Sequence, residues 1–243
     1  MKKYGLIGFP LSHSFSKKYF ARKFQTEKIG DCVYDNYPIE TIDAFPELIH
    51  SNPELQGLNV TIPYKEKVIP YLTNASPVVN TIRACNCIRI QNGELTGHNT
   101  DVAGFSFILN RQLNPKHKRA LVLGTGGASK AVNYVLDIQN IERISVSRNP
   151  APGVITYDDL TEEIVKEHLL IINTSPVGMY PGIGDAPSIP YSAITGNHLC
   201  VDLIYNPAKT KFLQLAEEKG SAIQNGEEML VVQAEESWKI WNS

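Results

Sequence analysis

Apolar runs of strand length alternate with stretches of helical periodicity along most of the chain. Amphipathic stretches such as residues 16–28 and 158–167 predict helices, and the short apolar runs between such stretches predict β-strands. This alternation is typical of βαβ units with mainly parallel sheets, so we expect an α/β fold. The predicted strands cover residues 4–8, 33–37, 57–62, 85–91, 119–124, 143–147, 169–173 and 198–203.

Local signals add a hairpin and a C-terminal helix. Asn92-Gly93 separates residues 85–91 from the short run 94–97, and this dipeptide favours a two-residue turn between antiparallel strands. Apolar residues recur with helical spacing over 227–241, where the opposite face is polar. Proline, glycine and polar residues predict loops over 110–118 and 181–190.

Composition and charge exclude several classes of protein. Hydrophobic residues make up 42% of the 243 residues and charged residues 20%, which argues against a disordered chain. The formal net charge of −2 gives no electrostatic reason to expect binding to nucleic acid or to a membrane surface. No apolar run approaches the roughly 20 residues that span a bilayer, and the N-terminus lacks the apolar core of a signal peptide. We therefore expect a cytoplasmic protein.

The cysteines predict neither a disulfide framework nor a metal site. The four residues Cys32, Cys85, Cys87 and Cys200 form no CxxC pair and are too few for a disulfide scaffold. Cys85 and Cys87 would face the same side of a strand, but no histidine lies at metal-ligand spacing from them. We expect reduced, mostly buried thiols and no metal.

A glycine-rich turn joins the strand at 119–124 to a helical pattern that continues to Leu136. The order of strand, glycine turn and helix is that of a dinucleotide-binding fold, in which backbone N–H groups at the helix N-terminus bind a pyrophosphate. The same glycines could simply build a tight turn, and the motif alone leaves both interpretations open. The turn consists of Gly124, Thr125, Gly126, Gly127, Ala128 and Ser129.

The residues after the next strand indicate which cofactor would fit. Residues 143–147 lead into Ser147-Arg148-Asn149, where a cofactor without a 2′-phosphate would favour an acidic residue. An arginine instead suits a 2′-phosphate, because its planar guanidinium makes paired charged hydrogen bonds. We therefore predict NADP(H) rather than NAD(H), although Arg148 could also be an ordinary loop arginine.

Polar side chains cluster in three places within the first hundred residues. Ser14 and Ser16 could cap the following helix or bind an anion at its N-terminus. Asn59 and Thr61 would share one face of a strand, and Lys65 would follow near the start of a helix, where a positive charge opposes the helix dipole. Asp101 would lie in the first turn of another helix, where an acid is favoured anyway.

Taken in order, seven motifs resemble the shikimate dehydrogenase family along the whole chain. They lie at residues 8–16, 59–65, 99–104, 124–129, 173–179, 201–207 and 225–230, and Gln233-Ala234 closes the set. The resemblance implies NADP-dependent, reversible reduction of 3-dehydroshikimate to shikimate. Where the family commonly has Asn-Arg-Thr, this chain keeps the arginine in Ser147-Arg148-Asn149 but changes both flanking residues.

The resemblance also implies roles for individual residues. Lys65 and Asp101 would form the catalytic pair, and which of them moves the proton stays open. Substrate would contact Ser14, Ser16, Asn59, Thr61, Asn86, Tyr205 and Gln233, with the serines on its carboxylate. Cofactor would contact Gly124, Thr125, Gly126, Gly127, Ala128, Ser129, Ser147, Arg148, Asn149, Met179 and Gly226.

The expected organisation is two α/β domains. Residues 1–101 plus 226–243 would bind substrate and carry the catalytic pair, and residues 102–225 would form a Rossmann-like NADP-binding domain. The only partner expected is the small-molecule substrate, with the chain a monomer or homodimer. Two alternatives remain: a quinate/shikimate dehydrogenase with relaxed cofactor choice, and a catalytically weak homologue that senses substrate or cofactor.

Overall fold

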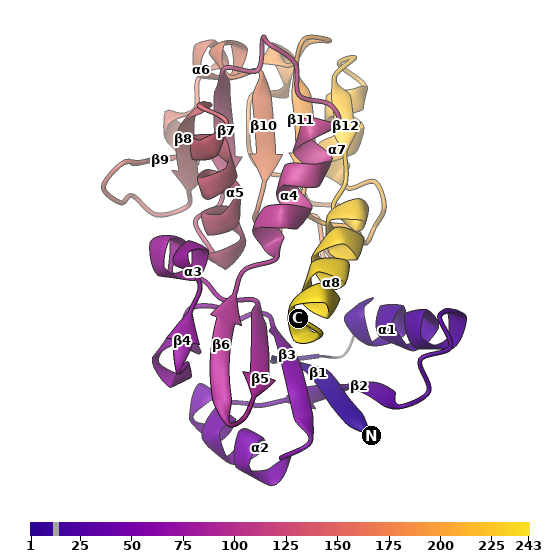
Figure 1. Cartoon of the computed structure of the whole chain (residues 1–243). Helices are drawn as coiled ribbons and strands as arrows, with labels where there is room; N and C mark the ends of the chain where they lie inside the picture. Colours follow the sequence, from indigo (N-terminus) through magenta and orange to yellow (C-terminus); the bar gives the residue numbers. More distant parts are fainter. Residues whose placement is uncertain (12–14) are drawn as a thin grey trace. The chain divides into compact units, whose positions relative to one another are not determined.

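The computed structural model describes residues 1–11 and 15–243, and the chain divides into two compact units. The first unit contains Met1–Asp101 and Gln233–Ser243, and the second contains Val102–Val232. Each unit is built on one six-stranded sheet with helices packed against it (Figure 1). The predicted α/β class with mainly parallel sheets is confirmed.

The sheet of the first unit has the order β2-β1-β3-β5-β6-β4. Strand β1 pairs in parallel with β2 and β3, and β5 runs antiparallel to β3 and β6. The predicted hairpin joins β5 to β6, with φ angles of 52° at Asn92 and 80° at Gly93. The strands are β1 (Lys2–Gly8), β2 (Cys32–Pro38), β3 (Leu55–Val60), β4 (Asn74–Ala75), β5 (Cys87–Gln91) and β6 (Glu94–His98).

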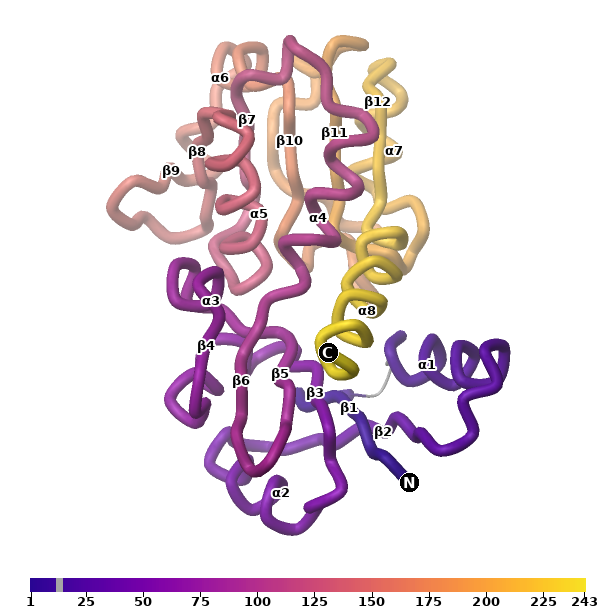
Figure 2. The backbone as a smooth tube through the Cα atoms, viewed as in Figure 1, coloured from indigo at the N-terminus to yellow at the C-terminus, as the bar shows by residue number. Residues whose placement is uncertain are grey.

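Helices cover both faces of this first sheet. One face packs against α2 (Phe45–Ser51) and α3 (Pro77–Ile82). The other packs against α1 (Phe15–Thr26) and the end of α8 (Glu227–Trp241), where an aromatic cluster contains Phe20 and Trp241. Figure 2 shows the yellow end of α8 beside the indigo α1. Two 3₁₀ turns, η1 (Ile42–Ala44) and η2 (Ile69–Tyr71), complete the unit.

A tight contact between β3 and α8 gives a stability prediction. A Cβ at Gly57 would lie 2.3 Å from Cδ1 of the Trp241 indole, whose Nε1 donates a 3.0 Å hydrogen bond to the Ile88 carbonyl. We expect Gly57→Ala to displace the indole and to lower the free energy of unfolding by about 1–3 kcal/mol, measured by urea denaturation. Gly30→Ala is the control, since a Cβ there meets no atom within 4 Å. Equal midpoints for the two variants would contradict the prediction.

The second unit has a fully parallel sheet of order β12-β11-β10-β7-β8-β9. Its strands alternate side chains between two apolar clusters, as strands buried on both faces must. The strands are β7 (Arg119–Leu123), β8 (Glu142–Ser147), β9 (Val154–Thr156), β10 (Leu170–Asn173), β11 (Leu199–Asp202) and β12 (Ala222–Gln224).

One face of this second sheet packs against α4 (Asp101–Asn110) and α5 (Gly127–Ile138), and the other against α6 (Glu162–Glu167) and α7 (Lys211–Glu217). The loops that follow β7, β8, β10 and β11 leave the sheet at the same edge, because parallel strands share the direction of their carboxyl ends. The remaining elements are the 3₁₀ turns η3 (Tyr157–Asp159) and η4 (Tyr191–Ala193).

Two local expectations are wrong. A single helix over 158–167 does not form, because η3 ends at Asp159 and Thr161 caps the separate α6 by accepting from the Ile164 N–H at 3.4 Å. Lys65 is not in the first turn of a helix either. It lies in a series of turns in which the Tyr64 N–H donates to the Thr61 carbonyl at 2.9 Å.

The boundary between the two units falls at Asp101 and again inside α8, after Val232. The predicted second boundary lies earlier, before Gly226. The assignment of substrate to one unit and cofactor to the other stays a prediction.

Candidate active site

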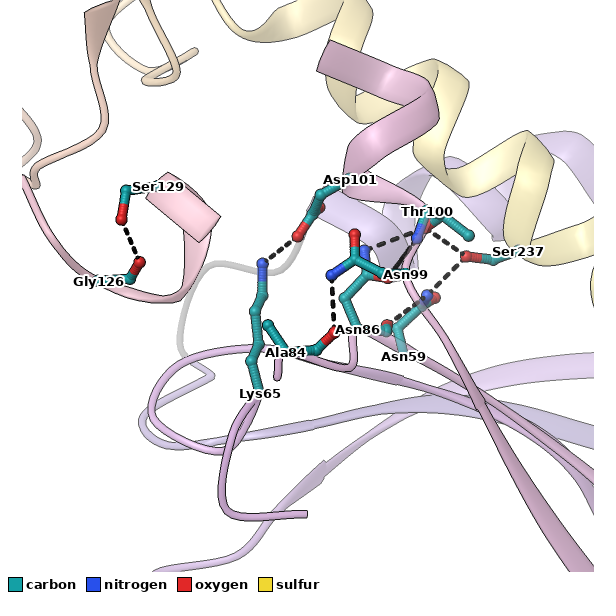
Figure 3. A network of polar contacts seen from close by, with 10 residues as sticks. All are labelled: Asn59, Lys65, Ala84, Asn86, Asn99, Thr100, Asp101, Gly126, Ser129 and Ser237. Carbon is teal, nitrogen blue, oxygen red and sulfur yellow. Dashed lines mark hydrogen bonds and ion pairs between the residues drawn. The ribbon is translucent and has the colours of Figure 1, made fainter. Parts of the chain in front are cut away.

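Lys65 and Asp101, 36 positions apart in the chain, form an ion pair in the first unit (Figure 3). The Lys65 ammonium donates to Asp101 Oδ2 at 2.6 Å, with side chains only 16% and 9% exposed. Asp101 begins α4, where the helix dipole favours a negative charge. The pair places an ammonium group, held by a carboxylate, in a partly buried site.

Asn86 fixes the segment that leads into Asp101. Its Oδ1 accepts from the Thr100 N–H at 2.6 Å, and its Nδ2 donates to the Thr100 hydroxyl at 3.0 Å. These two bonds hold the backbone just before α4, and therefore the start of the helix that carries Asp101. An amide has two N–H groups, so the second one on Asn86 can serve a ligand.

Asn59 is buried and its amide is almost fully used within the protein. Its Nδ2 donates to Ser237 Oγ at 2.8 Å and to the Asn86 carbonyl at 3.3 Å, while its Oδ1 accepts from the Tyr34 hydroxyl at 2.9 Å. Both amide hydrogens are thus engaged, and one lone pair remains. The predicted contact of Asn59 with a substrate hydroxyl is limited to that lone pair, and its bonds suit it to brace Asn86.

Ser237 and Tyr34 belong to this network, and the sequence did not single them out. The Ser237 hydroxyl donates to the Gln233 carbonyl at 2.9 Å and lies 3.3 Å from the Thr100 hydroxyl (Figure 3). A usable signal was the spacing, since Ser237 follows the predicted ligand Gln233 by one helical turn and shares its face.

For the other predicted substrate residues of the first unit, the structure gives mainly their position and burial. Thr61 follows the end of β3 and is half-buried, and Gln233 lies buried on α8. Ser16 is in the first turn of α1, hydrogen-bonded to Tyr34. Ser14 lies outside the described residues.

The glycine-rich turn in the second unit is shaped to approach a ligand closely. Gly124 has a φ of 114°, and a Cβ there would lie 2.8 Å from the Thr174 hydroxyl, so glycine is required. Gly126 is the N-cap of α5, without a side-chain cap and with no atom within 4 Å of a Cβ position. The N–H groups of Gly127 and Ala128 have no partner within the helix, whereas that of Ser129 donates to the Gly126 carbonyl at 3.1 Å. This open N-terminus fits a pyrophosphate.

The rest of the turn supports that geometry. Gly127 and Ala128 begin α5, and Thr125 precedes its N-cap. Buried Ser129 donates to the Gly126 carbonyl at 2.6 Å (Figure 3), so its hydroxyl braces the turn.

Arg148 is exposed immediately after β8, and its contact with a 2′-phosphate stays a prediction. Its flanking residues form a small turn in which the Asn149 N–H donates to Ser147 Oγ at 3.4 Å. Nearby, burial raises the pKa of Tyr157, and the charge of Arg148 opposes that shift. No carboxylate forms an ion pair with Arg148 among the described residues.

Three further predicted ligands lie on loops of the second unit. Met179 is 44% exposed in the loop after β10, and Tyr205 is half-buried in the loop after β11. Gly226 precedes α8, and a Cβ there would lie 2.1 Å from the Leu203 carbonyl oxygen. Glycine at this position therefore lets α8 begin directly against the backbone of the Tyr205 loop.

Comparison with known proteins identifies the family. Residues 6–88 match the model of the shikimate dehydrogenase substrate binding domain. The shikimate dehydrogenase (NADP(+)) of Clostridium beijerinckii is 37% identical over 254 residues, which cover 99% of this chain and 92% of that protein. The chain belongs to the shikimate dehydrogenase family.

Solved structures of the family share the fold over the full length of the chain. Shikimate dehydrogenase from Aquifex aeolicus has a TM-score of 0.89 and 32% identity, covering 100% of this chain and 92% of that one. The enzyme from Thermus thermophilus, solved in complex with NADP(H) and shikimate, has a TM-score of 0.87 and 29% identity, covering 99% and 93%.

Two negative observations hold for the part of the chain that the structure describes. It contains no group of three or more His, Cys, Asp or Glu side chains placed to hold a metal ion. None of its helices combines the length and the apolar character that crossing a membrane requires.

Proposed function

We propose that this chain catalyses the reversible, NADP-dependent reduction of 3-dehydroshikimate to shikimate. The observation that carries the proposal is the partly buried 2.6 Å ion pair between Lys65 and Asp101, in a chain of the shikimate dehydrogenase family. The Thermus thermophilus relative was solved with NADP(H) and shikimate bound.

The residues of the second unit fit the dinucleotide. The uncapped N-terminus of α5 at Gly126 offers N–H groups to a pyrophosphate, and exposed Arg148 offers a cation to a 2′-phosphate. NADP(H), when bound, supplies the hydride exchange.

Lys65 and Asp101 act on the oxygen atom bonded to the reacting carbon of the substrate. Negative charge builds on that oxygen during reduction, and an ammonium group stabilises the charge or donates a proton to it. Lys65 is the group that contacts the oxygen in this proposal. Asp101 holds the ammonium through the bond to Oδ2 and fixes its direction.

Neutral hydrogen-bonding groups suit the ring hydroxyls of the substrate. Asn86 is braced by Thr100 and retains one N–H for a ligand, and Gln233 and Thr61 supply further amide and hydroxyl groups. Tyr205, Ser14 and Ser16 are proposed to contact the carboxylate. The proposal includes a cytoplasmic location and a monomeric or homodimeric state.

An assay of purified protein tests the function. Oxidation of shikimate with NADP⁺ is followed by absorbance of the reduced cofactor, with quinate and NAD⁺ as alternative substrate and cofactor. We expect turnover with shikimate and NADP⁺, and a clearly lower kcat/KM with either substitute. Tight binding of shikimate without turnover would favour a sensor, and a preference for quinate or NAD⁺ would favour the relaxed-specificity alternative.

A further inference from the structure

Asp202 is a fully buried carboxylic acid at the end of β11 that the proposed chemistry does not use. Its Oδ1 accepts from Asn173 Nδ2 at 3.1 Å and from the Ile204 N–H at 3.0 Å, and its Oδ2 accepts from the Thr210 hydroxyl at 2.6 Å. Burying a carboxyl group costs free energy unless it is hydrogen-bonded. Three donors from three different segments therefore converge on one side chain.

Its neighbour Asn173 extends the network into the loop after β10. The two residues lie side by side at the ends of adjacent parallel strands. Asn173 Nδ2 also donates to the Val177 carbonyl at 3.2 Å, and its Oδ1 accepts from the Ser175 N–H at 3.1 Å and the Ser175 hydroxyl at 2.7 Å. The start of the loop that carries Met179 is thus bonded to a side chain that Asp202 orients.

The loop after β11 depends on Asp202 at both ends. At its start, the Ile204 N–H is held by Oδ1, and the Ile204 carbonyl accepts from the Gly226 N–H at 3.1 Å. At its end, the Thr210 hydroxyl bonds to Oδ2 while it caps α7 by accepting from the Leu213 N–H at 3.4 Å. The segments carrying Tyr205 and Gly226 therefore share one anchor.

Asp202 takes part in none of the ion pairs found among the residues that the structure describes. Burial raises the pKa of Asp202 to about 6, although its three hydrogen-bond donors act in the opposite direction. The charge of Asp202 helps to raise the pKa of Tyr191, on η4, whose largest cause is burial. The carboxyl group is held here by its hydrogen bonds to Asn173, Ile204 and Thr210.

We propose that Asp202 is a positioning residue for cofactor binding, which sets the loops after β10 and β11 in the conformation that receives NADP(H). The inference rests on the proposed function, because the loop after β10 carries the predicted cofactor ligand Met179, and the loop after β11 holds the predicted cofactor ligand Gly226 through the Ile204 carbonyl. Asp202 is fully buried, so it has no proposed contact with a reacting atom. It acts through Asn173, Ile204 and Thr210.

Calorimetric titration of NADP⁺ into the full-length protein tests the proposal without substrate. Asp202→Asn keeps the shape but places an N–H group against the Thr210 hydroxyl, which loses its acceptor. We expect the Kd for NADP⁺ to rise about tenfold, equivalent to about 1.4 kcal/mol. In the shikimate assay, the KM for NADP⁺ should rise in parallel, with kcat at saturating cofactor within about threefold of wild type.

Two comparisons separate positioning from general stability. Ser221→Ala removes a buried hydroxyl that donates to the His198 carbonyl at 3.0 Å, at the amino end of the same sheet. It should lower the urea midpoint and leave the Kd within twofold of wild type. Thr210→Val removes the partner of Oδ2 and should raise the Kd, whereas Thr210→Ser keeps the hydroxyl and should restore binding.

The outcomes distinguish this proposal from the proposed function. If the wild-type protein binds NADP⁺ and both Asp202→Asn and Thr210→Val bind it with the same Kd, the positioning role is overturned. The proposed function is then unaffected. If Asp202→Asn does not fold, the Kd values of Thr210→Val and Thr210→Ser for NADP⁺ test the positioning role instead. A wild-type protein that binds no NADP⁺ would overturn the proposed function, and the positioning role with it.

Discussion

Replacing Lys65 with alanine is expected to lower kcat for shikimate oxidation by about 10²- to 10⁴-fold, the usual effect of losing a general acid or base. The KM for NADP⁺ should stay within twofold, because Lys65 lies in the first unit and contacts Asp101 there. Steady-state kinetics with each substrate varied in turn measures both quantities.

Lys67→Ala is the matched control for Lys65→Ala. Lys67 is an exposed lysine two positions further along the chain, and it forms none of the ion pairs found in the described residues. The control should retain the wild-type kcat. Because Lys65→Ala leaves the Asp101 carboxylate without its partner, the urea midpoint is compared as well. A kcat within threefold of wild type, in a protein that is folded, would remove Lys65 from the chemistry.

Replacing Arg148 with alanine is expected to raise the KM for NADP⁺ by about 10- to 100-fold while changing the KM for NAD⁺ less than twofold. Paired hydrogen bonds from a guanidinium to a phosphate are charge-assisted and contribute roughly 1.5–3 kcal/mol. NAD⁺ has no 2′-phosphate, so it does not gain from Arg148. Initial rates measured over a range of concentrations of each cofactor, at saturating shikimate, give the ratio of the KM for NADP⁺ to the KM for NAD⁺.

Arg143→Ala provides the comparison for Arg148→Ala. Arg143 lies on the same strand β8 and forms an ion pair with Asp137. Its loss should change the stability slightly and leave the cofactor ratio unchanged. Equal effects of Arg148→Ala on NADP⁺ and NAD⁺ would show that the arginine does not read the phosphate.

The order of the motifs in the sequence was sufficient to predict the pairing of Lys65 with Asp101. It did not predict the hydrogen-bond partners of the other site residues. The two residues are 36 positions apart, and only the family resemblance joined them. Asn59 shows the limit, because the residues that occupy its amide, Tyr34 and Ser237, come from β2 and α8. Whether an amide is available to a ligand depends on such distant neighbours.

Local patterns predicted the fold well where one signal dominated. Asn92-Gly93 placed the hairpin, and the apolar spacing placed α8 at Glu227–Trp241. The turn around Lys65 was missed because polar residues after a strand resemble a helix start. The Lys65 carbonyl instead accepts from the N–H of Cys85 at 2.7 Å, a residue distant in the chain that the local pattern does not reveal.

The discontinuity of the first unit has a consequence for synthesis on the ribosome. Its aromatic cluster joins Tyr4 and Phe20 to Trp238 and Trp241, so it combines segments that lie on either side of the second unit in the chain. The second unit, Val102–Val232, is contiguous and can complete its core while translation continues. Until the final turns of α8 leave the exit tunnel, only α1 among the described helices is available to cover that face of the first unit's sheet.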